Sequence, residues 1–330
     1  MFQTDIIQYI QSFASPWLTS LMQLITSLGY GTFYILFFAV ITFGIDFRKG
    51  FLLIQLTMWT ASINEIFKNL FALPRPYHVD SLVQSLDSGI DNKLDHPFVE
   101  KDAPGFFDPL PAEVLDYYKG KEIPYGLPSG HTSMTLTLYV VLMRLFSPLW
   151  VKVLSLSLIV LIPFSRMYLG VHFLADVLGG YLLGFVLLGV YHRVILRRSK
   201  LHKFLQQISY PFQPSYYLLY AYLLLSPFVM LIVAPQAARQ AAFLVGINVG
   251  FLLIMRSGFP NNYASWIHRV LRVLIAILIF IAVTYAGSLF IETMGFSNNF
   301  YVQFTINALS NFIYIWGGVR LNTYLNLFGK

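Results

Sequence analysis

The residues best suited to chemistry lie between Ser165 and Asp176, where an arginine, a histidine and an aspartate stand between two strongly apolar segments. Ionisable groups inside or beside membrane spans are costly and usually serve a function. His172 and Asp176 are four residues apart, so on a helix the carboxylate can accept a hydrogen bond from one ring nitrogen. The other nitrogen is then available to attack phosphorus, which predicts a histidine nucleophile oriented by a carboxylate.

Two further stretches supply groups that suit a phosphate. Lys68 and Arg75 are seven residues apart, and on a helix seven steps of about 100° bring both cations to one side. The P-S-G-H sequence at Pro128–His131 precedes an apolar segment and predicts a helix start. Helix N-termini present free N–H groups and a positive dipole end, which favour a bound phosphate. Together these stretches predict a phosphate site with a nucleophile in it.

Each remaining charged group has a role in that chemistry. His131 is the available acid for the departing alkoxide. Lys68, Arg75 and Arg166 would neutralise the equatorial phosphate oxygens, the arginines through two-pronged hydrogen bonds. Because these side chains supply the positive charge, we predict neither a metal ion nor another cofactor.

The three stretches resemble the three signature motifs of the type-2 phosphatidic acid phosphatase family, K-x6-R-P, P-S-G-H and S-R-x5-H-x3-D, and every motif position is matched. The resemblance covers roughly residues 30–195. It implies a metal-independent lipid phosphatase with a phosphohistidine intermediate on His172, oriented by Asp176, and with His131 as proton donor. The expected phosphate-binding residues are Lys68, Arg75, Ser129, Gly130 and Arg166.

The composition predicts an integral membrane protein. The 330-residue chain is 57% hydrophobic and only 11% charged, well below the roughly 25% charged content of soluble domains. The absence of cysteine excludes disulfides, cysteine-ligated zinc and thiol catalysis. The most basic stretch, residues 193–203, lies beside an apolar segment, so we interpret it as a cytoplasmic anchor and expect no nucleic-acid partner.

We expect an all-α, polytopic transmembrane bundle of about nine spans. Residues 1–28 mix apolar positions with Gln, Ser and Thr, which favours an N-terminal amphipathic helix at the membrane interface over an ordinary first span. The catalytic core is expected over residues 29–195, and residues 196–330 would add four spans of unassigned role. The predicted spans lie near residues 29–45, 50–73, 129–147, 149–164, 172–196, 215–234, 238–256, 270–291 and 301–318.

Several polar or small residues of these spans have simpler explanations than chemistry. Asn64 and Glu65 are interpreted as polar residues near a helix end, with a supporting role at the site as the alternative. Four glycines of the fifth span predict close contact between helices, since small residues let backbones approach each other. These are Gly179, Gly180, Gly184 and Gly189.

Residues 77–126 form an acidic loop that is too long to be a simple turn. We expect a solvated cap over the active site, with a short helix near Ala112–Tyr118. Asp87, Asp91, Asn92 and Asp95 are close together but lack the spacing of an EF-hand, so calcium binding is not predicted. The aromatic residues of the loop would suit a surface lying against lipid head groups. They are Tyr77, Phe98, Phe106, Phe107, Tyr117 and Tyr118.

The placement of positive charge predicts the orientation. With alternate connections assigned to the cytoplasm, fourteen of the 22 Lys and Arg residues lie on that side. All three motifs then fall on the opposite side, so the active site is expected to face away from the cytoplasm. The composition is compatible with a bacterial plasma membrane, with the site facing the periplasm or exterior, and it does not exclude an internal eukaryotic membrane.

The predicted reaction is hydrolysis of a phosphomonoester or terminal pyrophosphate on a membrane lipid. The sequence does not distinguish undecaprenyl pyrophosphate, phosphatidylglycerophosphate, phosphatidate and a sphingoid-base phosphate, because all present an apolar tail and a terminal phosphate. A lipid phosphotransferase that passes the phosphate to a lipid acceptor is the alternative. A catalytically idle scaffold or transporter is disfavoured by the full set of reactive residues. Vanadate-dependent haloperoxidases resemble the site but are soluble.

Overall fold

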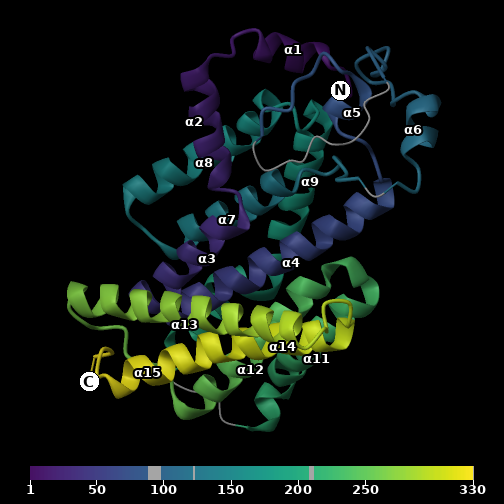
Figure 1. Ribbon diagram of the computed structural model, residues 1–330. Coiled ribbons are helices and arrows are strands. Elements are labelled where there is room, and N and C mark those ends of the chain that lie inside the picture. Colours follow the sequence, from purple (N-terminus) through teal and green to yellow (C-terminus); the bar gives the residue numbers. More distant parts are fainter. Residues whose placement is uncertain (88–97, 122, 208–211, 330) are drawn as a thin grey trace. The chain divides into compact units, whose positions relative to one another are not determined.

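The computed structural model describes residues 1–87, 98–121, 123–207 and 212–329, and in these ranges the secondary structure is helical, with no strand (Figure 1). The chain divides into two compact units. Unit 1 comprises Met1–Tyr34 and Ile63–Tyr191, and unit 2 comprises Ile35–Ser62 and His192–Lys330. The long helix α4 (Phe47–Phe71) has residues in both units, so the units do not follow a single boundary in the sequence.

Three long helices form the centre of unit 1. Helix α7 packs against both α8 and α9, and α1 and α2 pack against α8 (Figure 1). The short helix α6 confirms the helix expected at Ala112–Tyr118 within the long loop. The helices of unit 1 are α1 (Asp5–Gln11), α2 (Pro16–Ser27), α5 (Pro76–Val79), α6 (Ala112–Tyr118), α7 (Gly130–Leu145), α8 (Leu149–Tyr168) and α9 (Leu174–Tyr191).

Glycines bring α9 close to α7, as predicted for small residues in this helix. A Cβ at Gly180 would lie 2.6 Å from the carbonyl oxygen of Ser129, and one at Gly184 would lie 2.8 Å from Leu136. Gly179 likewise faces Leu127, whereas a Cβ at Gly189 would meet no atom of the described residues. The close approach therefore concerns the part of α9 beside the start of α7.

The described part of the loop 77–126 shares an apolar core with α1 and with residues 168–173. Ile7 packs there with Val83, Val114 and Phe173. The expectation that the loop aromatics lie on a surface against head groups is wrong for Tyr77, Phe98 and Tyr118, which are buried in this core. Apolar side chains leave water more readily when a neighbouring helix covers them, and α1 provides that cover. Phe106 and Phe107 are exposed.

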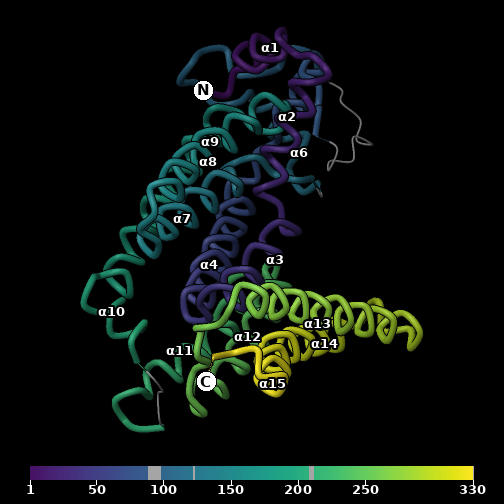
Figure 2. The backbone as a smooth tube through the Cα atoms, turned by 90° about the vertical axis from the view of Figure 1, so that its left-hand side faces the viewer, coloured from purple at the N-terminus to yellow at the C-terminus, as the bar shows by residue number. Residues whose placement is uncertain are grey.

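Unit 2 is built around α12, which packs against α11 and α14. Helices α13 and α14 run side by side (Figure 2). The long helices of unit 2 are α11 (Tyr217–Val233), α12 (Ala238–Ser257), α13 (Trp266–Thr293) and α14 (Phe300–Phe312). The shorter ones are η1 (Val40–Ile45), η2 (His192–Leu196), α10 (Arg198–Gln206), η3 (Pro214–Tyr216), η4 (Pro235–Ala237), η5 (Ile313–Gly317) and α15 (Gly318–Tyr324), and α3 (Gly31–Ala39) begins in unit 1.

Five helical segments of the described residues are long and apolar enough to cross a membrane. A sixth span results if α2 and Gly31–Ile45, which are bent by 54°, form one broken span. The chain is therefore a multi-pass membrane protein, while the nine spans and the interfacial helix over 1–28 stay predictions. Helix α7 is not among these segments, because its 16 residues are too few to cross a membrane. The five segments are Leu149–Tyr168, Leu174–Leu196, Pro214–Val233, Pro235–Ser257 and Trp266–Thr293.

Candidate active site

His172 and Asp176 form a buried hydrogen-bonded pair. The distance from His172 Nδ1 to Asp176 Oδ2 is 3.1 Å, and both side chains are almost fully buried. We expected both residues to lie on one helix, and this is wrong: α9 begins at Leu174, so Asp176 lies in the helix and His172 precedes it. The pair nevertheless forms. The same carboxylate oxygen accepts the backbone N–H of Phe173 at 3.0 Å, which holds it towards the segment that carries His172.

The surroundings of His172 keep its imidazole neutral. Burial, followed by repulsion from Arg75, Arg166 and Lys68, lowers the pKa of His172 well below its usual range. A neutral imidazole that bonds a carboxylate through Nδ1 carries its proton there, which leaves the lone pair on Nε2. Among the described residues Nε2 has no hydrogen-bond partner. His172 therefore has a free nitrogen of nucleophilic character.

Lys68 and Arg75 reach the site in different ways, so the prediction that they share a helix face is wrong. Lys68 lies in the last turn of α4, which ends at Phe71. Arg75 follows in an extended backbone conformation, because a residue before a proline avoids the helical region. Its Nε donates to the carbonyl oxygen of Pro124 at 2.8 Å.

The P-S-G-H stretch begins a helix, as predicted. Ser129 is the N-cap of α7, and its backbone N–H donates to the carbonyl oxygen of Asp176 at 2.9 Å. A Cβ at Gly130 would lie 3.0 Å from Asn64 Oδ1. Asn64 is buried and its amide nitrogen lies 3.4 Å from the carbonyl oxygen of Pro128. The interpretation of Asn64 as an end-of-helix polar residue is therefore wrong, because it contacts this stretch.

His131 is enclosed by the turn between α2 and α3. Its ring meets the Tyr30 ring edge-on, with 4.9 Å between the ring centroids. A Cβ at Gly29 would lie 2.5 Å from His131 Cδ2, so the absence of a side chain at Gly29 makes room for the imidazole. Gly29 and Tyr30 were missed in the sequence because no spacing links them to the motifs.

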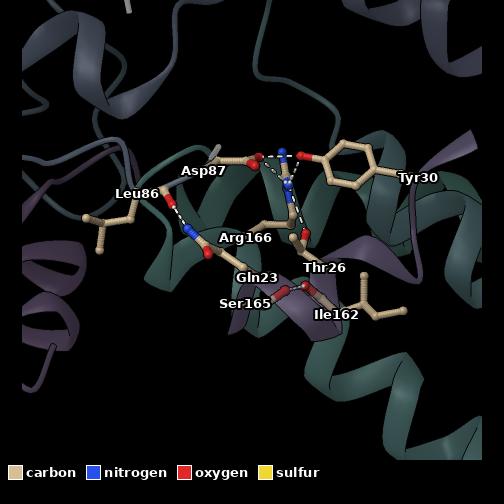
Figure 3. A network of polar contacts seen from close by, with 8 residues as sticks. All are labelled: Gln23, Thr26, Tyr30, Leu86, Asp87, Ile162, Ser165 and Arg166. Carbon is tan, nitrogen blue, oxygen red and sulfur yellow. Dashed lines mark hydrogen bonds and ion pairs between the residues drawn. The ribbon is translucent and has the colours of Figure 1, made fainter. Parts of the chain in front are cut away.

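Arg166 is held by residues that the motifs do not include. Its Nη1 donates to Thr26 Oγ1 at 2.8 Å, to the Tyr30 hydroxyl at 3.1 Å and to Asp87 Oδ2 at 2.8 Å (Figure 3). Asp87, considered above only as part of an acidic group, is thus the ion-pair partner of Arg166, and both side chains are buried. Asp91, Asn92 and Asp95 lie outside the described residues.

Buried polar atoms without partners gather among these residues. Within the described ranges, Arg75 Nη1, Ser129 Oγ, His131 Nε2 and Arg166 Nε form no hydrogen bond. A buried polar atom without a partner is costly, and a bound anion with several oxygens would satisfy such groups. The eight expected site residues all lie in unit 1. They are Lys68, Arg75, Ser129, Gly130, His131, Arg166, His172 and Asp176.

Comparison with known proteins gives a family and two relatives. The model of the PAP2 superfamily matches residues 49–200. An undecaprenyl-diphosphatase of Sulfolobus acidocaldarius is 44% identical over 64 residues, which are 19% of this chain and 31% of that protein. A lipid A 4'-phosphatase of Porphyromonas gingivalis is 32% identical over 93 residues, which are 28% of this chain and 38% of that protein. The chain thus matches about a third of the length of each relative.

Two solved structures are also similar. Aquifex aeolicus LpxE has 20% sequence identity and a TM-score of 0.39, over 58% of this chain and 94% of that one. The first transmembrane PAP2-type phosphatidylglycerolphosphate phosphatase from Bacillus subtilis has 23% identity and a TM-score of 0.39, over 59% of this chain and 89% of that one. TM-scores at this level do not establish a common arrangement of helices.

Proposed function

Because residues 49–200 match the model of the PAP2 superfamily, we propose that this protein is a metal-independent phosphatase of membrane lipid phosphates or pyrophosphates, acting through a phosphohistidine intermediate. The observation that carries the proposal is the buried pair of His172 and Asp176, with Nε2 of His172 left unbonded among the described residues. An imidazole oriented by a carboxylate is a competent nucleophile at neutral pH. The three cations beside it provide electrostatic stabilisation of a phosphoryl group.

The phosphate would bind to the buried donors of the site that lack partners. Arg75 Nη1, Arg166 Nε and Ser129 Oγ are buried donors that lack partners in the described chain. Hydrogen bonds from arginine to phosphate are charge-assisted and stronger than neutral ones. Lys68 adds a further positive charge. We assign these four residues, together with the backbone at Gly130, to phosphate binding.

The reaction proceeds in two balanced steps. Nε2 of His172 attacks phosphorus, the bond between phosphorus and the lipid oxygen breaks, and His131 gives its proton to that oxygen. Water then attacks the phosphohistidine, His131 takes a proton from the water, and the bond between phosphorus and Nε2 breaks to release inorganic phosphate. Asp176 holds the imidazole in one tautomer throughout, because its Oδ2 is the hydrogen-bond partner of His172 Nδ1 and also accepts the backbone N–H of Phe173.

The substrate class follows from the site and its setting. A terminal phosphate is what the cations and the nucleophile can act on, and the apolar helices place the protein in a bilayer that dissolves lipid tails. The names of the two relatives specify a lipid diphosphate and a lipid A phosphate. We therefore propose a lipid with a terminal phosphate or diphosphate as the substrate, and the bilayer as the partner of the protein.

Phosphate release tests this function. The purified, detergent-solubilised protein is given undecaprenyl pyrophosphate, phosphatidylglycerophosphate, phosphatidate, a sphingoid-base phosphate or lipid A, with EDTA present. We expect selective release of inorganic phosphate that disappears in His172→Ala. Retained activity in a folded His172→Ala protein would refute the phosphohistidine mechanism. Transfer of labelled phosphate to a second lipid would indicate the phosphotransferase instead.

We also propose that the site faces away from the cytoplasm, as in a bacterial plasma membrane with the site on the periplasmic side. The support is the distribution of Lys and Arg along the chain. The chain has no cysteine, so a single introduced cysteine is the only thiol that a maleimide can label, and its labelling shows on which side of the membrane that residue lies. Asp116→Cys on α6 should react with a membrane-impermeant maleimide added to intact cells, and Lys200→Cys on α10 should react only after the cells are opened. The reverse pattern would refute the orientation.

A further inference from the structure

The environment of Arg166 contains more than a phosphate site requires. Within the described residues, all hydrogen bonds of its guanidinium come from Nη1, to Thr26, Tyr30 and Asp87, while Nε has no partner (Figure 3). The guanidinium is a planar fork whose orientation decides where its remaining donors point. Anchoring at Nη1 therefore sets the direction in which Nε faces.

Asp87 is itself held in place from two sides. The side-chain amide of Gln23 on α2 donates to the carbonyl oxygen of Leu86 at 2.8 Å. The N–H of Leu86 donates to the carbonyl oxygen of Leu169, just after α8, at 3.0 Å. Since this segment is bonded to α2 and to the residue that follows α8, the Asp87 carboxylate is held as an acceptor for Arg166.

Tyr30 connects this ion pair to the expected proton donor. Its hydroxyl donates to Asp87 Oδ2 at 2.5 Å and lies 3.1 Å from Arg166 Nη1. Its ring contacts the His131 ring edge-on, at 4.9 Å between centroids. One side chain therefore contacts Arg166, Asp87 and His131, and it stands outside the segment that matches the family.

We propose that Tyr30 and Asp87 are positioning residues that fix Arg166 and His131 relative to each other at the phosphate. Asp87 holds the guanidinium of Arg166 in place. Tyr30 bonds both of these side chains through its hydroxyl and contacts the His131 imidazole through its ring, so it fixes the imidazole relative to Arg166. The inference rests on the proposed function, since it needs a phosphate to be bound and a leaving oxygen to be protonated.

The charge of Asp87 makes the proposal sharply testable, because a carboxylate beside an anion site acts in two opposite ways. As a negative charge it repels the anion, so its removal would strengthen anion binding. As an anchor it directs the donors of Arg166, so its removal would weaken binding. The sign of the change in affinity distinguishes an anchor from a charge that only neutralises a buried arginine.

The test measures binding of orthovanadate and turnover of the lipid in the full-length protein in detergent. Orthovanadate serves as the probe because it accepts the same donors as phosphate and its binding does not require turnover. The variants are Asp87→Asn and Tyr30→Phe, the second of which keeps the ion pair and the ring. Matched controls are Asp116→Asn, on the exposed side of α6, and Tyr9→Phe, at a position that is 68% exposed.

Loss of a charge-assisted hydrogen bond corresponds to roughly 10-fold or more in an equilibrium constant. We expect Asp87→Asn to raise the dissociation constant of orthovanadate by about that factor. Tyr30→Phe should lower kcat by roughly 3- to 10-fold with little change in KM, since it loosens His131. The double variant should lose less than the product of the two effects, as expected for residues in one network.

Unchanged or tighter orthovanadate binding in Asp87→Asn would overturn the proposal, as would a Tyr30→Phe enzyme with the kcat of Tyr9→Phe. Size-exclusion profiles and melting temperatures show whether each variant is folded, and Tyr30→Phe decides the matter if Asp87→Asn is not. If the wild-type protein releases no phosphate from any lipid, the proposed function fails first and the inference with it. If the wild type is active and only these variants match their controls, the proposed function stands and the inference alone is refuted.

Discussion

Replacing Gly29 with alanine should move the proposed proton donor. The added Cβ would lie 2.5 Å from Cδ2 and 3.3 Å from Nε2 of His131, whereas ordinary contacts begin at 3.4 Å. The imidazole must therefore retreat by about 1 Å, and a displacement of that size at a reacting group costs about 100-fold in rate. The φ of Gly29 is not in the left-handed region, so alanine fits the backbone itself.

The chain offers a matched control two residues away. A Cβ at Gly31, at the start of α3, would meet no atom within 4 Å. Gly31→Ala should therefore keep kcat within about twofold of the wild type, as surface substitutions usually do. Crowding at Gly29→Ala should lower the free energy of unfolding by about 1–3 kcal/mol, which still allows purification.

The assay is steady-state phosphate release from the preferred lipid, with kcat and KM measured separately. We expect Gly29→Ala to lower kcat by about 100-fold while KM changes little, because the phosphate-binding cations are untouched. A folded Gly29→Ala enzyme with the kcat of Gly31→Ala would refute the reasoning. It would show either that His131 tolerates displacement or that it does not donate the proton.

Three further predictions concern the nucleophile and its surroundings. Asp176→Asn should lower kcat by about 100-fold or more, because the imidazole loses the acceptor that selects its tautomer, and kcat equal to the wild type would contradict this. The acid limb of the plot of kcat/KM against pH should report the protonation of His172, whose pKa is lowered by burial and by the charge of Arg75. Arg75→Gln removes that charge and should move the limb to higher pH, whereas Arg75→Lys keeps the charge and should not. An unmoved limb in Arg75→Gln would refute the assignment to His172. EDTA should leave the rate unchanged and added Mg²⁺ should not raise it, since Lys68, Arg75 and Arg166 supply the charge; a rate restored by metal after chelation would contradict the mechanism.

The contact between His172 and Asp176 was predictable because the two residues are close in the sequence. His172 and Asp176 meet through four intervening peptide units, and Ser129 stands directly before the helix that it begins. The prediction that Arg75 shares a helix face with Lys68 was wrong, although both residues lie in the same unit as His172. The helix ends at Phe71, before Pro74, and Arg75 follows in an extended conformation.

The residues that support the site were not predictable from spacing. Asp87 contacts Arg166 across 79 positions, and Tyr30 contacts Arg166 across 136. No periodicity of a single helix links residues so far apart, and a lone aspartate in an acidic loop resembles any solvated carboxylate. The same limit explains why the buried aromatics of the loop were expected at the surface, since part of the apolar cluster that buries them, including Ile7 of α1 and Phe173, is distant in the sequence.

The packing of α1 has a consequence for synthesis of the chain. Gln11 donates to the carbonyl oxygen of Tyr168, which is 157 residues later, and Ile7 is buried beside Phe173. At about 5–20 residues per second, roughly 10–30 s pass between the appearance of α1 and that of its partners. During this interval the apolar face of α1 has no protein partner from that region, and contacts so distant in sequence form slowly. Polar substitutions at Ile7 should therefore reduce the yield of folded protein far more than the turnover of each folded molecule.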